Sequence, residues 1–222
     1  MFRRLRYDIR SIKERDPAAR SSAEIFFLYS GLHAVIYHRF AHWFYKHNRK
    51  FIARWISQFA RFMTGVEIHP GATIGKGLLI DHGSGVVIGE TAVVGDNCTI
   101  YQGVTLGGTG KDTGKRHPTL GNNVMVGSGA KVLGPFTVGD NAKIAAGAVV
   151  LDTVPEGATA VGVPARMILS GSKSKKNEDC LKNDLDQIHI PDPVSQELCK
   201  MYMRIEALEK QLEAQNKTTE EK

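Results

Sequence analysis

The chain has 222 residues, of which 42% are hydrophobic and 23% charged, and this balance is typical of one or two globular domains. Its net charge of +6 suits an anionic ligand, but the basic residues are spread out and no aromatic-basic module indicates a nucleic-acid partner. No apolar run is long enough to span a membrane, and the basic start MFRRLRYDIR lacks the apolar core of a signal peptide. We therefore expect a cytoplasmic protein without a membrane partner. The three cysteines have no metal-ligand spacing.

Residues 1–65 are predicted to form an N-terminal α-helical domain. Asp16 followed by Pro17 is typical of a helix start, with Asp as N-cap and Pro in the first turn. Ser21 and Glu24 have the spacing of a capping box. The domain is too small for a second enzyme, and we expect it to cover the open first coil of the repeat that follows.

Two apolar faces at three- and four-residue steps indicate the longer helices of this domain. One runs from Ile25 to Trp43, and the other from Phe51 to Met63. The second ends at Gly65, because glycine is favoured just after the last helical turn. Four histidines along these helices are interpreted as packing or surface residues: His33, His38, His42 and His47.

The middle of the chain, residues 66–168, is dominated by a six-residue repeat. A helix does not repeat at six, and a half-buried strand repeats at two, so this period predicts a parallel β-helix with one short strand and one turn per repeat. Three repeats form one triangular coil, and thirteen form about four coils. The aliphatic positions are Ile68, Ile74, Ile80, Ile88, Val94, Ile100, Leu106, Leu120, Val126, Val132, Val138, Ile144 and Val150. The Pro and Gly residues after Val150 are expected to end the repeat.

Two insertions interrupt the period, and each carries a histidine. Two extra residues enter around Asp81–Gly85, which includes His82, and the segment Gly107–Thr119, which includes His117, leaves the coil as a loop. Insertions in solenoids tend to lie on one binding face. These two segments are therefore the candidate site.

Residues 169–222 are predicted to be a polar linker, a C-terminal amphipathic helix and a tail. The linker is Gly171–Asp179, and the last residues, Asn216–Lys222, are expected to be disordered. Alternating three- and four-residue spacing favours a helix that either forms a coiled coil or lies on the body of the protein. Its stripe is Leu198, Met201, Ile205, Leu208 and Leu212.

Several motifs occur together in the order Asp16-Pro17, Glu67-Ile68-His69-Pro70, Asp81-His82-Gly83, Thr105-Leu106-Gly107-Gly108-Thr109-Gly110, Arg116-His117-Pro118 and Gly162-Val163-Pro164-Ala165-Arg166. This combination resembles the serine O-acetyltransferase family, in a short bacterial form, over roughly residues 1–200. The resemblance implies a left-handed β-helix. It also implies that acetyl passes from acetyl-CoA to the hydroxyl of L-serine, the first step of cysteine biosynthesis.

The chemistry of such a transfer agrees with the residues present. The serine hydroxyl must lose a proton, and histidine suits this task because its pKa lies near the working pH. His82 is the predicted base. A carboxylate should orient its ring, and Glu67, fifteen residues earlier, belongs on a neighbouring rung. Many members of the family carry Asp there, which is one methylene shorter.

The resemblance assigns further roles to residues of both insertions. Asp16 and Asp81 would face the ammonium group of serine, with Asp16 coming from its own or a neighbouring subunit. Arg116 would bind the substrate carboxylate. His117 would lie near the reacting hydroxyl or the departing sulfur.

By the same resemblance, acetyl-CoA is the co-substrate and no metal is required. CoA would lie in a groove between adjacent solenoids and contact Gly108, Ser128, Lys143, Ala146 and Arg166. Sites between solenoids imply a homotrimer, with a hexamer as the alternative. L-Cysteine would compete with serine as a feedback inhibitor. The chain ends in Lys222 and not in the Ile that docks into O-acetylserine sulfhydrylase in many members, which puts that complex in doubt.

Three alternatives remain open at the level of sequence. The chain could be another hexapeptide acetyltransferase that acts on a sugar or an antibiotic. It could be a metal-dependent lyase of the carbonic anhydrase type, although His69, His82 and His117 lack the close paired spacing of such sites. It could also be a non-catalytic scaffold.

Overall fold

The computed structural model describes residues 2–110, 113–168, 201–205 and 208. Contacts divide the chain into one unit, Met1–Gly171, that holds the helices and the solenoid, and another, Ser172–Lys222. In the second unit, residues 201–205 are helical and exposed, which agrees with part of the predicted C-terminal helix. The polar linker and the rest of that helix lie outside the described residues.

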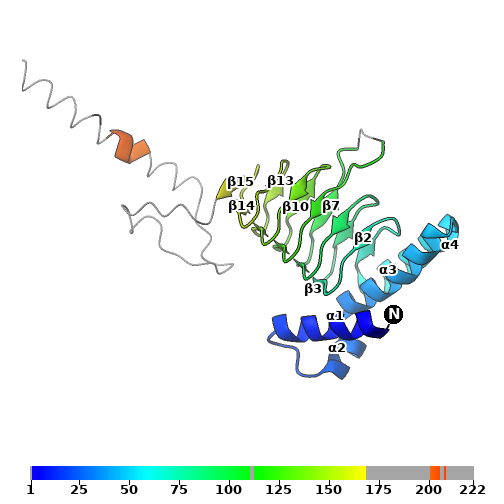
Figure 1. Cartoon of the computed structure of the whole chain (residues 1–222). Helices are drawn as coiled ribbons and strands as arrows, with labels where there is room; N and C mark the ends of the chain where they lie inside the picture. Colours follow the sequence, from blue (N-terminus) through cyan, green and yellow to red (C-terminus); the bar gives the residue numbers. More distant parts are fainter. Residues whose placement is uncertain (1, 111–112, 169–200, 206–207, 209–222) are drawn as a thin grey trace, which may run out of the picture. The chain divides into compact units, whose positions relative to one another are not determined.

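The helical character of the first 64 residues is confirmed. The four helices are α1 (Phe2–Arg15), α2 (Ser22–Leu28), α3 (Ser30–Lys46) and α4 (Lys50–Thr64), and they lie at the start of the solenoid (Figure 1). Gly65 ends α4 in the left-handed conformation, with φ of 72°, as predicted. Ser21 caps α2 by accepting the amide of Glu24, while the Glu24 carboxylate accepts the amide of Arg20.

The prediction that Asp16 starts a helix is wrong. Asp16 follows the last residue of α1, and its amide donates to the carbonyl of Ile12 at 2.9 Å. Its side chain instead closes a turn, because Oδ1 accepts the amide of Ala18 at 2.8 Å. The Asp-Pro pair therefore separates two helices.

The apolar face predicted from Ile25 to Trp43 is divided between two helices. Tyr29 lies between α2 and α3 with extended backbone, at φ −86° and ψ 102°. The chain bends there because α3 begins against the end of a solenoid strand, where a Cβ on Gly31 would clash with the carbonyl of Ile80.

The buried face of α4 is made of small residues and not of its aromatic ones. Ala53, Ser57 and Ala60 are buried, and the Ser57 hydroxyl donates to the carbonyl of Ile68 at 2.8 Å. Small side chains allow the helix to lie close to α3 and the first strand. The aromatic side chains of the same helix remain exposed in the single chain.

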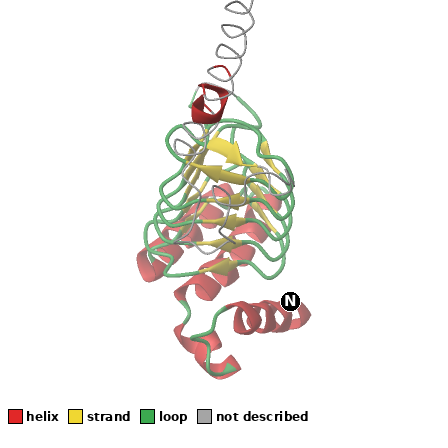
Figure 2. Ribbon diagram, turned by 90° about the vertical axis from the view of Figure 1, so that its left-hand side faces the viewer, coloured by secondary structure: helices red, strands yellow, loops and turns green. Residues whose placement is uncertain are grey.

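The solenoid is a left-handed parallel β-helix with three faces (Figures 1 and 2). Sheet A contains β1 (Glu67–Ile68), β4 (Val87–Ile88), β7 (Thr105–Gly107), β10 (Lys131–Leu133) and β13 (Val149–Val150). Sheet B contains β2 (Thr73–Ile74), β5 (Val93–Val94), β8 (Thr119–Leu120) and β11 (Thr137–Val138). Sheet C contains β3 (Leu79–Ile80), β6 (Thr99–Ile100), β9 (Met125–Val126), β12 (Lys143–Ile144), β14 (Thr159–Val161) and β15 (Arg166–Ile168).

The aliphatic positions of the repeat form the core, as predicted. All thirteen are at most 9% exposed. Each strand pairs in parallel with the strand one coil later, so that Ile68 lies beside Ile88 and Ile88 beside Leu106. The residues two places earlier in the repeat are small enough to fill the corners, and Cys98 is one of them, fully buried.

The repeat continues beyond Val150, where it was expected to stop. Val154 forms a parallel bridge with Val138 on sheet B, and β14 pairs in parallel with β12 on sheet C. The coil ends only where β15 turns back and pairs with β14 in antiparallel fashion. The Pro and Gly residues of this segment do not end the coil, because its apolar residues continue to fill the interior.

Three rows of turns connect the faces, and we name each by the sheets that it joins. The AB edge contains residues 69–72, 89–92, 108–110, 113–118 and 134–136, the BC edge residues 75–78, 95–98, 121–124 and 139–142, and the CA edge residues 81–86, 101–104, 127–130 and 145–148. Sheet A therefore has the CA edge on one side and the AB edge on the other.

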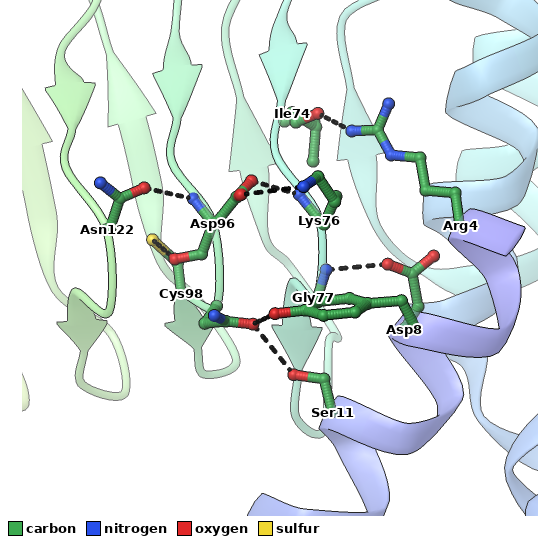
Figure 3. Close-up of polar contacts among 11 residues, drawn as sticks. Arg4, Asp8, Ser11, Ile74, Lys76, Gly77, Asp96, Cys98 and Asn122 are labelled. Atoms are coloured by element: carbon green, nitrogen blue, oxygen red, sulfur yellow. Dashed lines mark hydrogen bonds and ion pairs between the residues drawn. The ribbon is translucent and has the colours of Figure 1, made fainter.

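Helix α1 packs on the BC edge (Figure 3). The Asp8 carboxylate accepts the amide of Gly77 at 2.8 Å and pairs with Arg39 of α3 at 2.6 Å. Arg15 donates to the carbonyls of Asn97 and Cys98 at 2.8 and 3.0 Å. The helical domain thus covers the first coil, as expected from the need to shield an open solenoid end.

Candidate active site

The structure distributes the predicted site residues over two edges of the solenoid. Asp81 and His82 lie on the CA edge, whereas Arg116 and His117 lie on the AB edge. The two pairs are separated by the width of sheet A, on the order of 10 Å for the short run of extended residues between them. A single chain therefore presents two half-sites.

His82 has the backbone geometry of a specialised residue. Its φ is 54°, in the left-handed region that side chains disfavour. In the described ranges the other non-glycine residues with positive φ are all asparagines, Asn48, Asn97, Asn123 and Asn141. The His82 side chain is 78% exposed, and its Nε2 lies 3.9 Å from Oδ1 of Asp81. Unusual backbone conformations of this kind concentrate at functional sites.

Asp16 reaches the same edge from the helical domain of its own chain. The Tyr29 hydroxyl donates to Asp16 Oδ2 at 2.7 Å. Burial, then the bond to Asp16, and more weakly the charge of Asp81 raise the pKa of Tyr29 to about 12. Tyr29 therefore lies within reach of both carboxylates, which supports their predicted convergence.

Glu67 has a different partner from the predicted one. Its Oε2 lies 3.0 Å from NH1 of Arg61 on α4. The backbone of its segment does lie beside the His82 turn, because the Gly85 amide donates to the carbonyl of Gly65 at 3.0 Å. The contact between the Glu67 carboxylate and the His82 ring stays a prediction.

On the AB edge, Arg116 is held by a carboxylate that the sequence analysis did not single out. Arg116 donates to Oε2 of Glu90 at 2.6 Å, and the Tyr45 hydroxyl donates to Oε1 at 2.9 Å. The Arg116 and Tyr45 hydrogen bonds hold the pKa of Glu90 below its ordinary value. One nitrogen of the guanidinium is thereby fixed to Glu90.

His117 is buried against the same turn. Its Nδ1 lies 2.9 Å from the Thr91 hydroxyl and 3.2 Å from the Thr91 amide. Burial lowers the pKa of His117, and the neighbouring Arg116 charge lowers it further. The ring also occupies the space where Gly89 has no side chain, since a Cβ there would overlap its Cδ2 and Nε2 atoms.

His69 has a structural contact on the same edge. The Gly71 amide donates to its Nδ1 at 3.0 Å, and its ring meets that of Tyr45 edge-on at 5.9 Å. Burial lowers the pKa of His69. In the described part of the chain, no group of three or more His, Cys, Asp or Glu residues is arranged to hold a metal ion.

The residues predicted to contact CoA divide between the edges. Ser128 and Ala146 lie on the CA edge in line with His82, along a ladder in which each corner amide bonds the coil before it, as from Gly147 to the Ser128 carbonyl at 2.8 Å. Lys143 and Arg166 lie on strands of sheet C further along the solenoid. Gly108 instead lies on the AB edge, where its missing side chain leaves room for Arg116.

Sequence reasoning missed Tyr45, Glu90 and Thr91. Glu90 and Thr91 come two and three places after the aliphatic Ile88, one coil before Gly108. If the repeats had been counted coil by coil, Glu90 and Thr91 would have been placed next to the inserted loop. The six-residue period therefore contained the information needed to find them. Tyr45 had none, because its position depends on how α3 packs against the first coil.

None of the helices that the structure describes is both long and apolar enough to cross a membrane.

A three-faced hexapeptide solenoid with catalytic-type residues on its corners defines the hexapeptide-repeat transferases. Two family models agree: residues 117–152 match the bacterial transferase hexapeptide (six repeats), and residues 85–108 match the hexapeptide repeat of succinyl-transferase.

Comparison with known proteins narrows the class. The chain is 53% identical to a serine acetyltransferase of Synechococcus elongatus over 217 residues, 97% of this chain and 86% of the relative. It is similar to the crystal structure of a Brucella abortus serine acetyltransferase in complex with coenzyme A, with a TM-score of 0.74, 48% identity, and coverage of 75% of this chain and 67% of that one. A Neisseria gonorrhoeae serine acetyltransferase in complex with serine gives a TM-score of 0.73, 44% identity, and coverage of 75% and 68%. The chain belongs to the serine acetyltransferase family.

Proposed function

We propose that this protein transfers the acetyl group of acetyl-CoA to the hydroxyl of L-serine, which yields O-acetyl-L-serine and CoA. The observation that carries the proposal is the pair of half-sites on the two edges of sheet A, one with carboxylates and an exposed histidine and one with a fixed guanidinium. Serine carries an ammonium, a carboxylate and a hydroxyl, and the two half-sites offer a complementary group for each.

His82 is the proposed general base. Its exposed ring can reach a ligand on the CA edge, and histidine is the side chain used most often to remove such a proton in catalysis. The proton passes from the serine hydroxyl to the His82 ring while the oxygen attacks the thioester carbonyl. The C–S bond then breaks, and CoA leaves as the thiol after its sulfur takes the proton from His82. Glu67 is proposed to support the imidazolium that forms, which requires its carboxylate to exchange Arg61 for His82.

The amino-acid backbone of the substrate is held by charge. Asp16 and Asp81 converge near Tyr29 and would face the ammonium group. Arg116 would bind the carboxylate with the donors that Glu90 leaves available. The carboxylates that would bind the ammonium group and the guanidinium that would bind the carboxylate therefore belong to different edges.

This division supports a trimer. The CA edge of one solenoid must meet the AB edge of another for the two half-sites to join, and three copies around a threefold axis satisfy every edge. Exposed aromatic side chains on α4 fit such an assembly, because Phe51, Trp55 and Phe62 are 85%, 63% and 86% exposed in the single chain. A hexamer of two trimers is the alternative.

Acetyl-CoA would lie along the joint between two solenoids. The CA edge supplies Ser128 and Ala146, and the neighbouring AB edge supplies Gly108. Lys143 and Arg166 would meet the phosphates.

L-Cysteine, which differs from serine by SH in place of OH, would compete for the same half-sites. A cytoplasmic location fits a biosynthetic enzyme.

The test is release of thiol from acetyl-CoA with and without L-serine, in the presence of EDTA. Serine-dependent release that EDTA does not change would support the acetyltransferase and remove the metal-dependent lyase. Release only with a sugar or antibiotic acceptor would move the activity to a sister enzyme. No release with any acceptor would favour the scaffold.

A further inference from the structure

Thr91 uses all of its polar atoms on the loop that carries Arg116 and His117. Its hydroxyl oxygen accepts the amides of Arg116 and His117 at 3.0 and 3.1 Å. Its carbonyl accepts the Lys115 ammonium at 2.7 Å. Its amide and hydroxyl both contact His117 Nδ1. A single residue one coil earlier thus holds three consecutive residues of the insertion, the side chain two of them and the backbone carbonyl the third.

The valence of these atoms determines where the His117 proton lies. A threonine hydroxyl has two lone pairs and one proton. Both lone pairs are directed to backbone amides, so the proton must go to His117 Nδ1. The Thr91 amide can only donate, and it also faces Nδ1. Two independent donors therefore require an unprotonated Nδ1, and a neutral ring then carries its proton on Nε2.

Close packing keeps the ring in this position. The Cδ2–Nε2 edge of His117 lies over the Cα of Gly89, where any larger residue would collide with it. The ring is 8% exposed, so a flip that exchanges its nitrogens would have to displace either the turn or the loop. Gly89 and Thr91 hold the ring from two sides.

The surroundings also disfavour the charged ring. The titratable groups that act on His117 are Arg116 and Lys115 on its own loop, Glu90 on the adjacent turn and His69 on the turn before that. Two cations outweigh the single carboxylate, whose charge is already shared with Arg116 and Tyr45. Protonation of Nδ1 would also place a proton against two donors.

We infer that Thr91 is a positioning residue that fixes His117 as the neutral Nε2–H tautomer, so that His117 donates a hydrogen bond to a substrate oxygen and does not act as a second base. This assignment rests on the proposed acetyl transfer to serine for its substrate, but the tautomer itself does not depend on it. The two histidines of the site then have opposite tasks, since His82 accepts a proton and His117 offers one.

The first measurement is the nitrogen NMR spectrum of the wild-type protein labelled with ¹⁵N-histidine, recorded between about pH 6 and 8. Protonated and unprotonated ring nitrogens have well-separated shifts. Comparison with His117→Gln identifies the signals. We expect Nδ1 of His117 to be unprotonated and Nε2 protonated over the whole range. A protonated Nδ1 would overturn the inference, and this result needs no variant of Thr91 to fold.

The second measurement compares Thr91→Val, which removes the hydroxyl at constant shape, with Thr91→Ser, which keeps it. Valine leaves the amides of Arg116 and His117 without their acceptor and leaves Nδ1 with the backbone amide as its single donor, so kcat/KM for serine should fall about 10- to 100-fold, and the pKa of His117 should rise. The KM for acetyl-CoA should not change. Serine at this position should restore activity to within about threefold. Thr137→Val, on an exposed residue of β11, serves as the matched control.

The outcomes separate this inference from the proposed function. Equal activity of Thr91→Val and wild type, or equal loss in Thr91→Val and Thr91→Ser, would refute a role of the hydroxyl while serine acetylation stands. Absence of serine turnover in the wild type would refute the function while the NMR result still decides the tautomer.

Discussion

On both the BC and the AB edge of the solenoid, side chains form hydrogen bonds to other segments of the chain. The segments that they hold differ between the two edges. On the BC edge, Asp96 Oδ1 accepts the amide of Lys76 at 2.7 Å, and Asn122 Oδ1 accepts the amide of Asp96 at 2.9 Å. The series continues from Asn122 to Asp140 at 2.7 Å. Each of these side chains bonds the backbone of a neighbouring coil (Figure 3). We call this row of bonds the BC ladder, and all of its bonds stay within the regular coils.

On the AB edge the corresponding side chains serve an insertion. Glu90 and Thr91 bond Arg116 and His117, which lie 25 or 26 residues later in the loop. These bonds hold residues of the loop to which we assign substrate binding, and not the next corner of the coil. The same turn chemistry therefore stabilises the coil where the repeat is regular and supports the proposed site where it is interrupted.

The largest effect should follow from removal of the proposed base. His82→Ala should lower kcat by about 10²- to 10⁴-fold, the usual contribution of general base catalysis, without loss of the trimer. Steady-state kinetics and size-exclusion chromatography would measure both.

Asn141→Ala is the matched control for this change. Asn141 is exposed on the BC edge and has φ of 58°, so alanine meets the same backbone penalty there. Its activity should equal that of wild type. If His82→Ala were as active as this control, His82 would not be the base.

On the stability side, the strongest test lies where α1 meets the BC edge. Asp8 is 1% exposed and pairs with Arg39. Asp8→Ala leaves that guanidinium without its counter-charge and the Gly77 amide without an acceptor, so the free energy of unfolding should fall by about 3–5 kcal/mol. Urea unfolding at fixed protein concentration would measure it.

The kcat of the folded Asp8 variant should be unchanged, because Asp8 lies outside both half-sites. Asp152→Ala, at an exposed turn, should alter stability by less than about 0.5 kcal/mol. A loss of kcat in Asp8→Ala without a loss of stability would contradict the view that the BC edge contributes to stability and not to activity.

A pH dependence should arise where α3 meets the AB edge. His38 is buried, with Nε2 3.2 Å from the Ala72 carbonyl, and burial lowers its pKa from 6.5 to about 3. The unfolded chain therefore binds a proton below pH 6.5 that the folded chain refuses until about pH 3. Stability present above pH 6.5 is lost as the pH falls, with a slope of up to about 1.4 kcal/mol per pH unit.

His38→Gln keeps a donor to Ala72 but does not titrate. Between pH 7 and pH 5 the wild type should lose about 2 kcal/mol more stability than this variant. Parallel profiles for the two proteins would show that His38 is not the group responsible.

The sequence predicted the solenoid well because its period is a local property. Each aliphatic position has the same kind of neighbours in every coil, so spacing alone identified Ile68, Ile88 and Leu106 as interior positions. The helical domain was predicted less well. The bend at Tyr29 and the turn at Asp16 are set by packing against the first coil, which no local pattern records.

For the candidate site, the sequence identified the residues but not their arrangement. His82 and His117 were found because each lies in an interruption of the period. Their separation on opposite sides of sheet A follows only from counting faces around the coil. Glu90 and Thr91 escaped because they act through other residues and occupy ordinary positions of the repeat, and Tyr45 escaped because its position depends on how α3 packs.

The smallest expected effect concerns the hold on Arg116. Glu90→Gln keeps the shape of the side chain but removes the charge that pairs with the guanidinium, and its amide group turns a donor toward Arg116 or Tyr45. Arg116 should then bind the serine carboxylate less well, and the KM for serine should rise about tenfold. Steady-state kinetics with each substrate varied should show no change in the KM for acetyl-CoA.

Tyr45→Phe provides the graded control for Glu90→Gln, because it removes a neutral bond to Glu90 Oε1 and leaves the ion pair intact. Its effect on the KM for serine should be no more than about threefold. An equal effect of the two variants would mean that the shape of the AB edge, and not the charge of Glu90, positions Arg116. An unchanged KM for serine in Glu90→Gln would show that Glu90 is not needed to position the Arg116 guanidinium. Thr91 would then be the one residue of the AB edge that holds the inserted loop in a functional position.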